Sequence, residues 1–152
     1  MKIAITGEKG FLGYHLTQYY KHISKDEFPE WGFADHIVVK LGKNYLKNIN
    51  LLKECDVLIH CAGVNRGDNV YEKNVEITRI LVESLIQNDI SINIKFPSSI
   101  QEDYGNEYGN SKIKCKEILE NYCKNNSTIF ESYKIHNVYC MYTMCTTHEV
   151  PM

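Results

Sequence analysis

Several features that are absent from the 152-residue sequence exclude whole classes of function. Lys and Arg total 17 and Asp and Glu total 19, so the formal charge is 17 − 19 = −2 and no basic block is present to bind nucleic acid. No apolar run reaches the roughly 18 residues that a membrane span needs, and the N-terminus runs from Met1 into a β-rich segment without a signal-peptide pattern. We therefore expect a cytoplasmic protein without nucleic-acid or membrane partners.

Metal-ligand spacing is also missing. The six cysteines form no Cys-x-x-Cys pair, and the six histidines are scattered along the chain. We predict reduced thiols and no metal site.

Short β-rich runs alternate with segments of helical periodicity along the chain. The predicted strands are Lys2–Thr6, His36–Lys40, Asp56–His60, Ile92–Phe96 and Thr128–Tyr133. The predicted helices are about Phe11–Ile23, Tyr45–Glu54, Val70–Gln87 and Tyr108–Lys124, with a loop at Ser24–Asp35 and with Pro97 ending the fourth strand. This alternation predicts an α/β fold, a doubly wound parallel sheet with right-handed crossovers.

Three glycines with the spacing Gly-x-x-Gly-x-x-Gly follow the first predicted strand. This spacing suits a dinucleotide because Gly7 allows a tight turn, Gly10 lets the backbone approach a pyrophosphate, and Gly13 lets the helix pack closely. Phe11 and Leu12 would open the helix, whose free N–H groups and positive dipole end attract phosphates. The alternative is a turn with close helix packing and no ligand.

A tyrosine and a lysine stand four residues apart on a predicted helix, at Tyr108 and Lys112, so their side chains share one helix face. A neighbouring ammonium favours the phenolate of a phenol whose pKa is otherwise about 10, and this makes the phenol a usable acid or base. Ser98 and Ser99 follow the preceding strand and offer a hydroxyl to the same substrate oxygen. The alternative is a surface helix on which the two residues meet this spacing by chance.

These pieces together resemble the extended branch of the short-chain dehydrogenase/reductase family, which works on nucleotide-linked sugars. Besides the glycine loop, the resemblance rests on three segments in the same order: Asp56-Val-Leu-Ile-His-Cys-Ala-Gly63, then Asn74-Val-x-x-Thr78-x-x-Leu81-x-Glu83, then the serine pair with Tyr-x-x-x-Lys. Two further segments are similar to reductases that act at C4 of a UDP-linked 4-keto-6-deoxy-N-acetylhexose in bacterial surface-polysaccharide pathways: Ala62-Gly-Val-Asn-Arg66 and Ser98-Ser-Ile-Gln101. The resemblance implies a Rossmann-type fold and an NAD(P)-dependent oxidoreductase.

The resemblance also implies a role for each residue of the catalytic set. Tyr108 would donate a proton to the C4 carbonyl oxygen as hydride arrives from a nicotinamide, Ser99 would hydrogen-bond that oxygen, and Lys112 would lower the tyrosine pKa and bind the nicotinamide ribose. Ser98 is the alternative to Ser99, since the sequence does not fix which hydroxyl faces the substrate. Nucleotide-sugar epimerases and dehydratases share this set, but dehydratases usually carry Asp-Glu where Ile-Gln follows Ser99 here, which favours reduction or epimerisation over elimination.

The predicted cofactor is NADPH, with NADH as the alternative. Lys40 and Lys43 lie at and after the end of the second predicted strand, and no acidic residue occurs from His36 through Leu46 to bind the ribose hydroxyls of NADH. The alternative is that both lysines are solvated surface charges.

The loop after the third predicted strand is expected to contact the cofactor. Ala62 and Gly63 are small enough to let the backbone lie against the adenosine, and Val64 would pack on the adenosine or the nicotinamide ribose. Asn74 has two open interpretations: it opens the family's helical pattern, or it satisfies a neighbouring backbone group.

Near its end the sequence departs from the family pattern. Lys134 stands where the family has arginine and Cys140 where it has glycine, and the region that grips the nucleotide and the sugar is missing after that point. We expect an NAD(P)-binding Rossmann domain at 1–140 and an irregular tail at 141–152. Such a chain is an active reductase, a truncated non-catalytic remnant, or a subunit completed by a homodimer partner or by a second chain.

Overall fold

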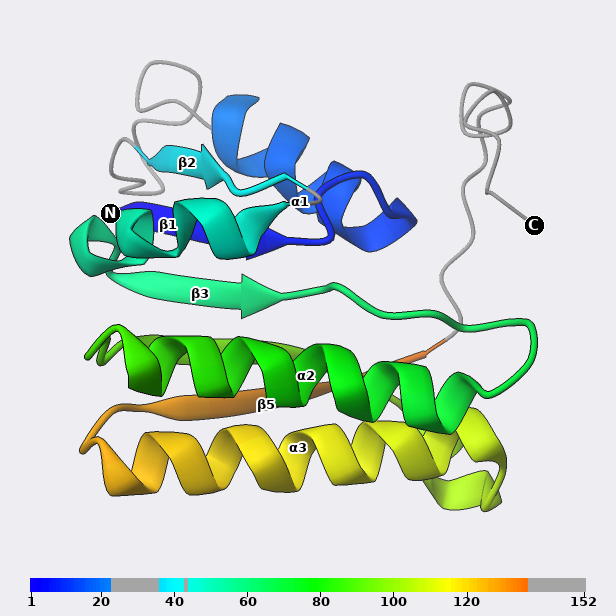
Figure 1. The fold of residues 1–152 in the computed structure, drawn as a ribbon. Coiled ribbons are helices and arrows are strands. Elements are labelled where there is room, and N and C mark those ends of the chain that lie inside the picture. Colours follow the sequence, from blue (N-terminus) through cyan, green and yellow to red (C-terminus); the bar gives the residue numbers. More distant parts are fainter. Residues whose placement is uncertain (23–35, 43, 137–152) are drawn as a thin grey trace.

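The computed structural model describes residues 1–22, 36–42 and 44–136, and they form a parallel sheet with helices on both faces (Figure 1). The strands are β1 (Lys2–Thr6), β2 (Ile37–Lys40), β3 (Val57–His60), β4 (Asn93–Ser99) and β5 (Phe130–Ile135). The α-helices are α1 (Phe11–His22), α2 (Val70–Gln87) and α3 (Glu107–Asn125), and the 3₁₀ helices are η2 (Tyr45–Glu54) and η3 (Ile100–Tyr104). The predicted doubly wound α/β fold is confirmed.

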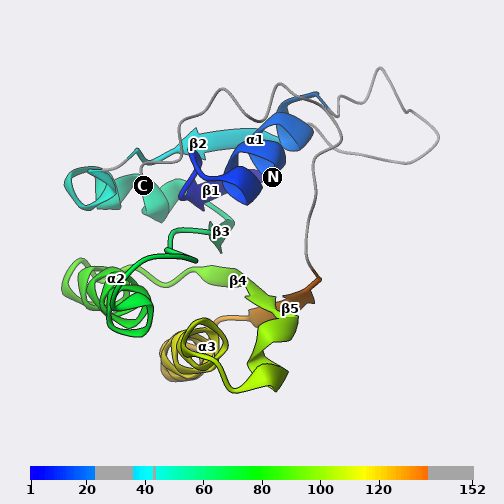
Figure 2. The same cartoon turned by 90° about the vertical axis from the view of Figure 1, so that its right-hand side faces the viewer.

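The two faces of the sheet are covered unequally. α2, α3 and η2 lie on one side and α1 on the other (Figure 2). The first side holds the larger core cluster, which includes Leu58, Ile94, Phe96, Leu81, Leu85 and Leu119. The second side holds a smaller cluster, in which Ile3, Ile5, Val57 and Ile59 pack against Leu16 and Tyr20 of α1. Strand residues alternate between the two clusters, as the period of two along a β-strand requires.

The strand order β2-β1-β3-β4-β5 creates a switch point beside β1. The chain leaves β1 for β2 on one side and then returns to β3 on the other side, and all pairs are parallel. The carboxyl ends of all five strands therefore meet at one edge, which we call the carboxyl edge and which lies on the right in Figure 1. In open parallel sheets, ligands bind at this edge beside the switch point.

One boundary predicted from the sequence is wrong. Pro97 does not end the fourth strand, because β4 continues through it to Ser99 and pairs with β5 along that length. The Ile94 N–H is directed toward the β5 side, where it donates to the Ile129 carbonyl, so by alternation the nitrogen of Pro97 faces β3. Since the last β3–β4 pair is Ile59 with Lys95, the missing N–H of Pro97 falls where no ladder partner is needed.

The predicted helix at Tyr45–Glu54 has these bounds but a different geometry. It is 3₁₀, and it is interrupted by Asn48, whose φ of −111° and ψ of 16° are not helical. A 3₁₀ helix places residues three apart on one side, and Ile49 and Leu52 are both buried. The predicted loop Ser24–Asp35 and the tail 141–152 lie outside the described residues.

Candidate active site at the carboxyl edge

The glycine loop after β1 is built from backbone packed directly against backbone. Gly7 has a φ of +70°, and a Cβ at this position would lie 2.7 Å from the Ala62 nitrogen on the loop after β3. A Cβ on Gly13, in the first turns of α1, would overlap the Gly7 carbonyl oxygen. The Gly10 N–H donates to that same carbonyl at 2.9 Å. Side chains are therefore excluded where the loop after β1 meets the loop after β3, at Gly7, and where α1 meets the loop after β1, at Gly13.

The first turn of α1 points its amides toward the same loop. Phe11 begins the helix, with 43% of its surface exposed, and Leu12 is half-buried. The first N–H groups of a helix have no partner within the helix and carry its positive dipole end. The structure thus brings the predicted cofactor residues of α1 next to the glycine loop.

A buried histidine, which the sequence analysis did not single out, connects the strand ends. His60 is completely buried at the end of β3, where its Nδ1 lies 2.7 Å from Thr6 Oγ1 and its Nε2 lies 3.2 Å from Thr78 Oγ1. Thr6 Oγ1 also accepts a hydrogen bond from the Ala62 N–H at 3.3 Å. Burial, with a smaller contribution from the Lys112 charge, lowers the pKa of His60 to about 3, so the ring is neutral. The only signal in the sequence was a polar residue ending an otherwise apolar strand.

Asn74 holds the loop after β3 in place. Its Oδ1 accepts from the Val64 N–H at 2.7 Å, and its Nδ2 donates to the Val64 carbonyl at 2.9 Å and to Ser111 Oγ at 2.9 Å. Gly63 lies against the same amide, since a Cβ there would meet Asn74 Oδ1 at 3.0 Å. Of the two interpretations left open, satisfying a neighbouring backbone group is confirmed, and the bond to Ser111 ties this loop to α3 as well.

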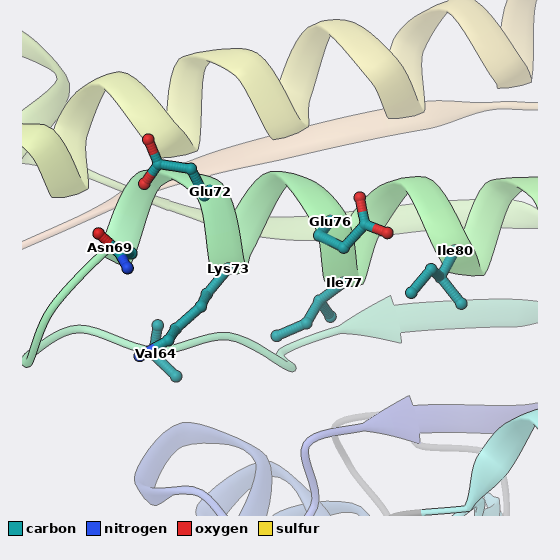
Figure 3. Close-up of a pocket in the computed structure, with 7 residues that line it drawn as sticks. All are labelled: Val64, Asn69, Glu72, Lys73, Glu76, Ile77 and Ile80. Atoms are coloured by element: carbon teal, nitrogen blue, oxygen red, sulfur yellow. The ribbon is translucent and has the colours of Figure 1, made fainter.

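An apolar cavity of about 440 Å³ lies beside the Val64 loop. Figure 3 shows Val64 on that loop and Lys73, Ile77 and Ile80 on α2, with their side chains directed into the same space. Asn69, Glu72 and Glu76 complete the lining. This cavity is wide open to solvent.

The two candidate serines have different partners. Ser99 is the N-cap of η3, where its Oγ accepts a hydrogen bond from the Gln101 N–H at 3.2 Å. Ser98 donates its hydroxyl to the Glu102 carboxylate. Successive strand residues point to opposite faces, so Ser98 shares the α3 side of the sheet with Phe96. Both serines are largely buried.

Tyr108 and Lys112 lie in successive turns of α3, which begins at an N-cap where Asn106 Oδ1 accepts from the Gly109 N–H at 2.7 Å. The Lys112 ammonium is buried; it donates to the Pro97 carbonyl at 3.2 Å and lies 5.5 Å from the Tyr108 ring centroid. It also lies 4.7 Å from the centroid of the Phe96 ring. The lysine thus joins the tyrosine to the end of the strand that carries both serines.

The electrostatics of this pair differ from the prediction. We expected Lys112 to lower the pKa of Tyr108, but burial raises the pKa of the Tyr108 phenol. Burial also lowers the pKa of Lys112. Desolvation disfavours the charged form of each group, so burial moves the two pKa values in opposite directions.

The proposed cofactor-specificity residues are only partly described. Lys40 ends β2 and pairs with Ile5 of β1. Nothing is described of its side chain, and Lys43 lies outside the described residues. Their preference for NADPH remains a prediction.

Two kinds of feature are absent from the described residues. They contain no group of three or more His, Cys, Asp or Glu residues arranged to hold a metal ion. No helix among them combines the length and the apolar character of a membrane-spanning segment.

The chain is similar in sequence to a known reductase. No family model matches the chain. A UDP-2-acetamido-2,6-beta-L-arabino-hexul-4-ose reductase of Pseudomonas aeruginosa is 32% identical over 124 residues, which are 79% of this chain and 31% of that protein. The chain thus matches less than a third of the relative's length.

Solved structures share the arrangement of strands and helices. The capsular polysaccharide assembling protein CapF from Staphylococcus aureus is 26% identical and has a TM-score of 0.62, over 91% of this chain and 35% of that one. RMD from Pseudomonas aeruginosa, solved in complex with NADPH, is 18% identical and has a TM-score of 0.69, over 90% of this chain and 53% of that one. The second likeness concerns the fold alone.

Proposed function

Because this chain belongs to the extended short-chain dehydrogenase/reductase family, also called the NAD-dependent epimerase/dehydratase family, we propose that it binds NADPH and reduces the C4 ketone of a nucleotide-linked sugar. The observation that carries the proposal is the position of Lys112. Its buried ammonium lies between the ring of Tyr108 and the Pro97 carbonyl, two residues before Ser99. A cation held between the ring of a phenol and the end of the strand that carries the serines is suited to stabilise a phenolate that forms during proton transfer.

The loops at the switch point fit a dinucleotide. Because no Cβ is accommodated at Gly7 or Gly13, the start of α1 lies directly against the glycine loop, and the positive end of its dipole favours a phosphate there. Phe11 and Leu12 supply N–H groups of this proposed pyrophosphate site, and Gly10, whose own N–H is bonded to the Gly7 carbonyl, leaves room for the pyrophosphate because it has no side chain. When bound, the cofactor supplies the hydride for the reduction.

The adenosine end has its own proposed site at the loop after β3. Ala62 and Gly63 offer a flat backbone surface, and Val64 lines the apolar cavity beside α2. Lys40, at the end of β2, is proposed to bind the 2′-phosphate that distinguishes NADPH from NADH.

The proposed proton donor is Tyr108. Its raised pKa keeps the phenol protonated at neutral pH, as a donor to the C4 carbonyl oxygen must be. The O–H bond breaks as a new O–H bond forms on the sugar, which leaves a phenolate whose charge Lys112 stabilises. Ser99 is proposed to donate a hydrogen bond to the same carbonyl oxygen, because its own oxygen already accepts from Gln101.

The proposed substrate is a UDP-linked 4-keto-6-deoxy-N-acetylhexose, since the sequence relative is named as a reductase of such a hexulose. Epimerisation of a nucleotide-linked sugar is the second candidate, because epimerases share Ser, Tyr and Lys. We further propose that the protein acts in the cytoplasm. We also propose that it associates with a second copy of itself or with a second chain.

Two measurements on the purified chain test this function. Titration with NADPH and with NADH, followed by cofactor fluorescence, is expected to give the lower Kd for NADPH. Addition of the UDP-linked 4-keto sugar should then oxidise the bound NADPH. Binding without oxidation would identify a non-catalytic dinucleotide-binding protein, whereas failure to bind either cofactor would overturn the proposal.

A further inference from the structure

A carboxylate beside the two serines is held by three elements of the fold. The side chain of Glu102, in η3, is only 5% exposed. It accepts the hydroxyl of Ser98 from β4, and its Oε2 lies 2.9 Å from Lys116 Nζ of α3 and 3.9 Å from Lys134 Nζ of β5. Lys134 also pairs with Asp103 at 2.8 Å. We call Glu102, Ser98, Lys116 and Lys134 the Glu102 cluster.

The two serines have different hydrogen-bonding roles because only Ser98 donates its hydroxyl to Glu102. The hydroxyl hydrogen of Ser98 is donated to a buried carboxylate, and a charge-assisted bond of this kind is about twice as strong as a neutral one. Ser99 only accepts, from the Gln101 N–H, so its own hydroxyl hydrogen remains to be donated to another group. A serine that is to donate a hydrogen bond to a substrate carbonyl oxygen needs a hydroxyl hydrogen that is not already donated, as in Ser99.

The same carboxylate also fixes the helix of the catalytic set. Lys116 lies four residues after Lys112, so both point from one face of α3 toward the end of β4. Lys112 binds the Pro97 carbonyl and Lys116 binds the carboxylate that holds Ser98. α3 is thus attached to the end of β4 at two successive helical turns, through Lys112 and through Lys116, and these two attachments fix the distance between them.

We propose that Glu102 is a positioning residue that selects Ser99 as the reacting hydroxyl and holds it at a fixed distance from Tyr108 and Lys112. This inference rests on the proposed reduction for its catalytic meaning. Glu102 itself touches no substrate. It acts by engaging Ser98 and by tying η3 to α3, so that the turn capped by Ser99 keeps its geometry.

Amide hydrogen exchange tests the positioning without any need for turnover, because the Gln101 N–H reports the position of Ser99 Oγ. In Glu102→Ala the exchange at Gln101 should accelerate about tenfold or more as the turn loosens. Glu102→Gln keeps an acceptor for Ser98 but loses the charge, so it should lie between Ala and wild type. Glu117→Gln is the matched control, since Glu117 pairs with Lys114 at 2.9 Å on the exposed side of the same helix, and it should leave Gln101 unchanged. Unaltered protection of Gln101 in both Glu102 variants would overturn the proposal.

Kinetics with NADPH and the UDP-linked 4-keto sugar then test the choice of serine. Ser99→Ala should lower kcat by about 100-fold or more and Ser98→Ala by no more than about tenfold. Glu102→Ala should lower kcat by about 10- to 100-fold while the Kd of NADPH stays within about twofold, since misplacement costs turnover and not cofactor binding. Equal losses in the two serine variants would refute the selection of Ser99. If the wild-type chain oxidises no NADPH, the proposed function fails, and the exchange result still decides whether Glu102 positions Ser99.

Discussion

The two halves of the carboxyl edge are held together by different means. At the ends of β1 and β3, backbone contacts backbone, and Gly7 and Gly13 leave no room for a side chain. At the end of β4 and the start of α3, named functional groups make the contacts, as Lys112 does with the Pro97 carbonyl and Glu102 with Ser98. We call the first half the dinucleotide half and the second the reaction half. The geometry of the dinucleotide half depends on the absence of side chains, whereas that of the reaction half depends on hydrogen bonds made by particular side chains.

The largest effect is expected in the reaction half, from removal of one oxygen. Tyr108→Phe should lower the rate of NADPH oxidation with the keto sugar by about 10²- to 10⁴-fold, the range for loss of a general acid. The Kd of NADPH should remain near the wild-type value, because the ring still fills its place beside Lys112. Steady-state kinetics and a fluorescence titration measure both quantities. Retention of full activity would remove Tyr108 from the mechanism.

In the dinucleotide half, the addition of one methyl group should be the damaging change. Gly13→Ala forces a Cβ onto the Gly7 carbonyl, and overpacking of this kind costs about 3 kcal/mol of unfolding free energy. Gly10→Ala is the matched control, since its Cβ would lie 3.3 Å from the same oxygen and needs a much smaller adjustment. Urea denaturation compares them. Equal losses would show that the loop tolerates no side chain anywhere, not only at its backbone contacts.

His60 lies where the halves adjoin, and it should make the stability depend on acid. Its pKa falls from 6.5 to about 3 on folding, so the unfolded chain takes up the proton first as the pH drops. The free energy of unfolding should therefore decrease below about pH 6.5, by about 2 kcal/mol at pH 5 from this group. His60→Gln should remove this part of the pH dependence, whereas the control His15→Gln, on the exposed surface of α1, should keep it. Denaturation curves between pH 7 and pH 4 provide the comparison, and an identical slope in His60→Gln would contradict the assignment.

The smallest effect is expected from the bond between Ser111 of α3 and Asn74, the residue that holds the Val64 loop. Ser111 Oγ accepts from Asn74 Nδ2 at 2.9 Å and donates to the Tyr108 carbonyl at 2.6 Å. Ser111→Ala should cost about 1 kcal/mol of unfolding free energy, the net value of a typical hydrogen bond. Ser132→Ala, exposed on β5, is the control and should change nothing measurable. A loss of several kcal/mol would mean that the two halves are coupled far more strongly than this bond indicates.

Much of the fold was predictable because its signals are local. Helix α2 has the predicted bounds, Val70–Gln87, since its apolar positions recur with helical spacing. The fourth strand was not, because the effect of Pro97 depends on where β3 ends, which no local pattern contains. The same holds for the 3₁₀ geometry at Asn48.

The candidate site divides in the same way. The close backbone contacts of the glycine loop could be predicted because the sequence itself shows which positions have no side chain. The role of this loop in binding a cofactor is still a prediction. Contacts such as Thr6 with His60, 54 residues apart, and Asn74 with Ser111, 37 residues apart, were not readable, because each depends on a partner brought close only by the sheet. The raised pKa of Tyr108 was missed for the same reason, since burial depends on packing.

The length difference between β3 and β4 allows Lys112 to bind the end of the longer strand. β4 runs past the last residue of its neighbour, so the overhanging Pro97 carbonyl is released from the ladder and becomes an acceptor for Lys112. If β3 were two residues longer, one of its backbone N–H groups would donate to the Pro97 carbonyl, and the Lys112 ammonium would lose this hydrogen-bond acceptor. In this architecture, the reach of one strand beyond another determines whether a charged group can be kept in the interior at all.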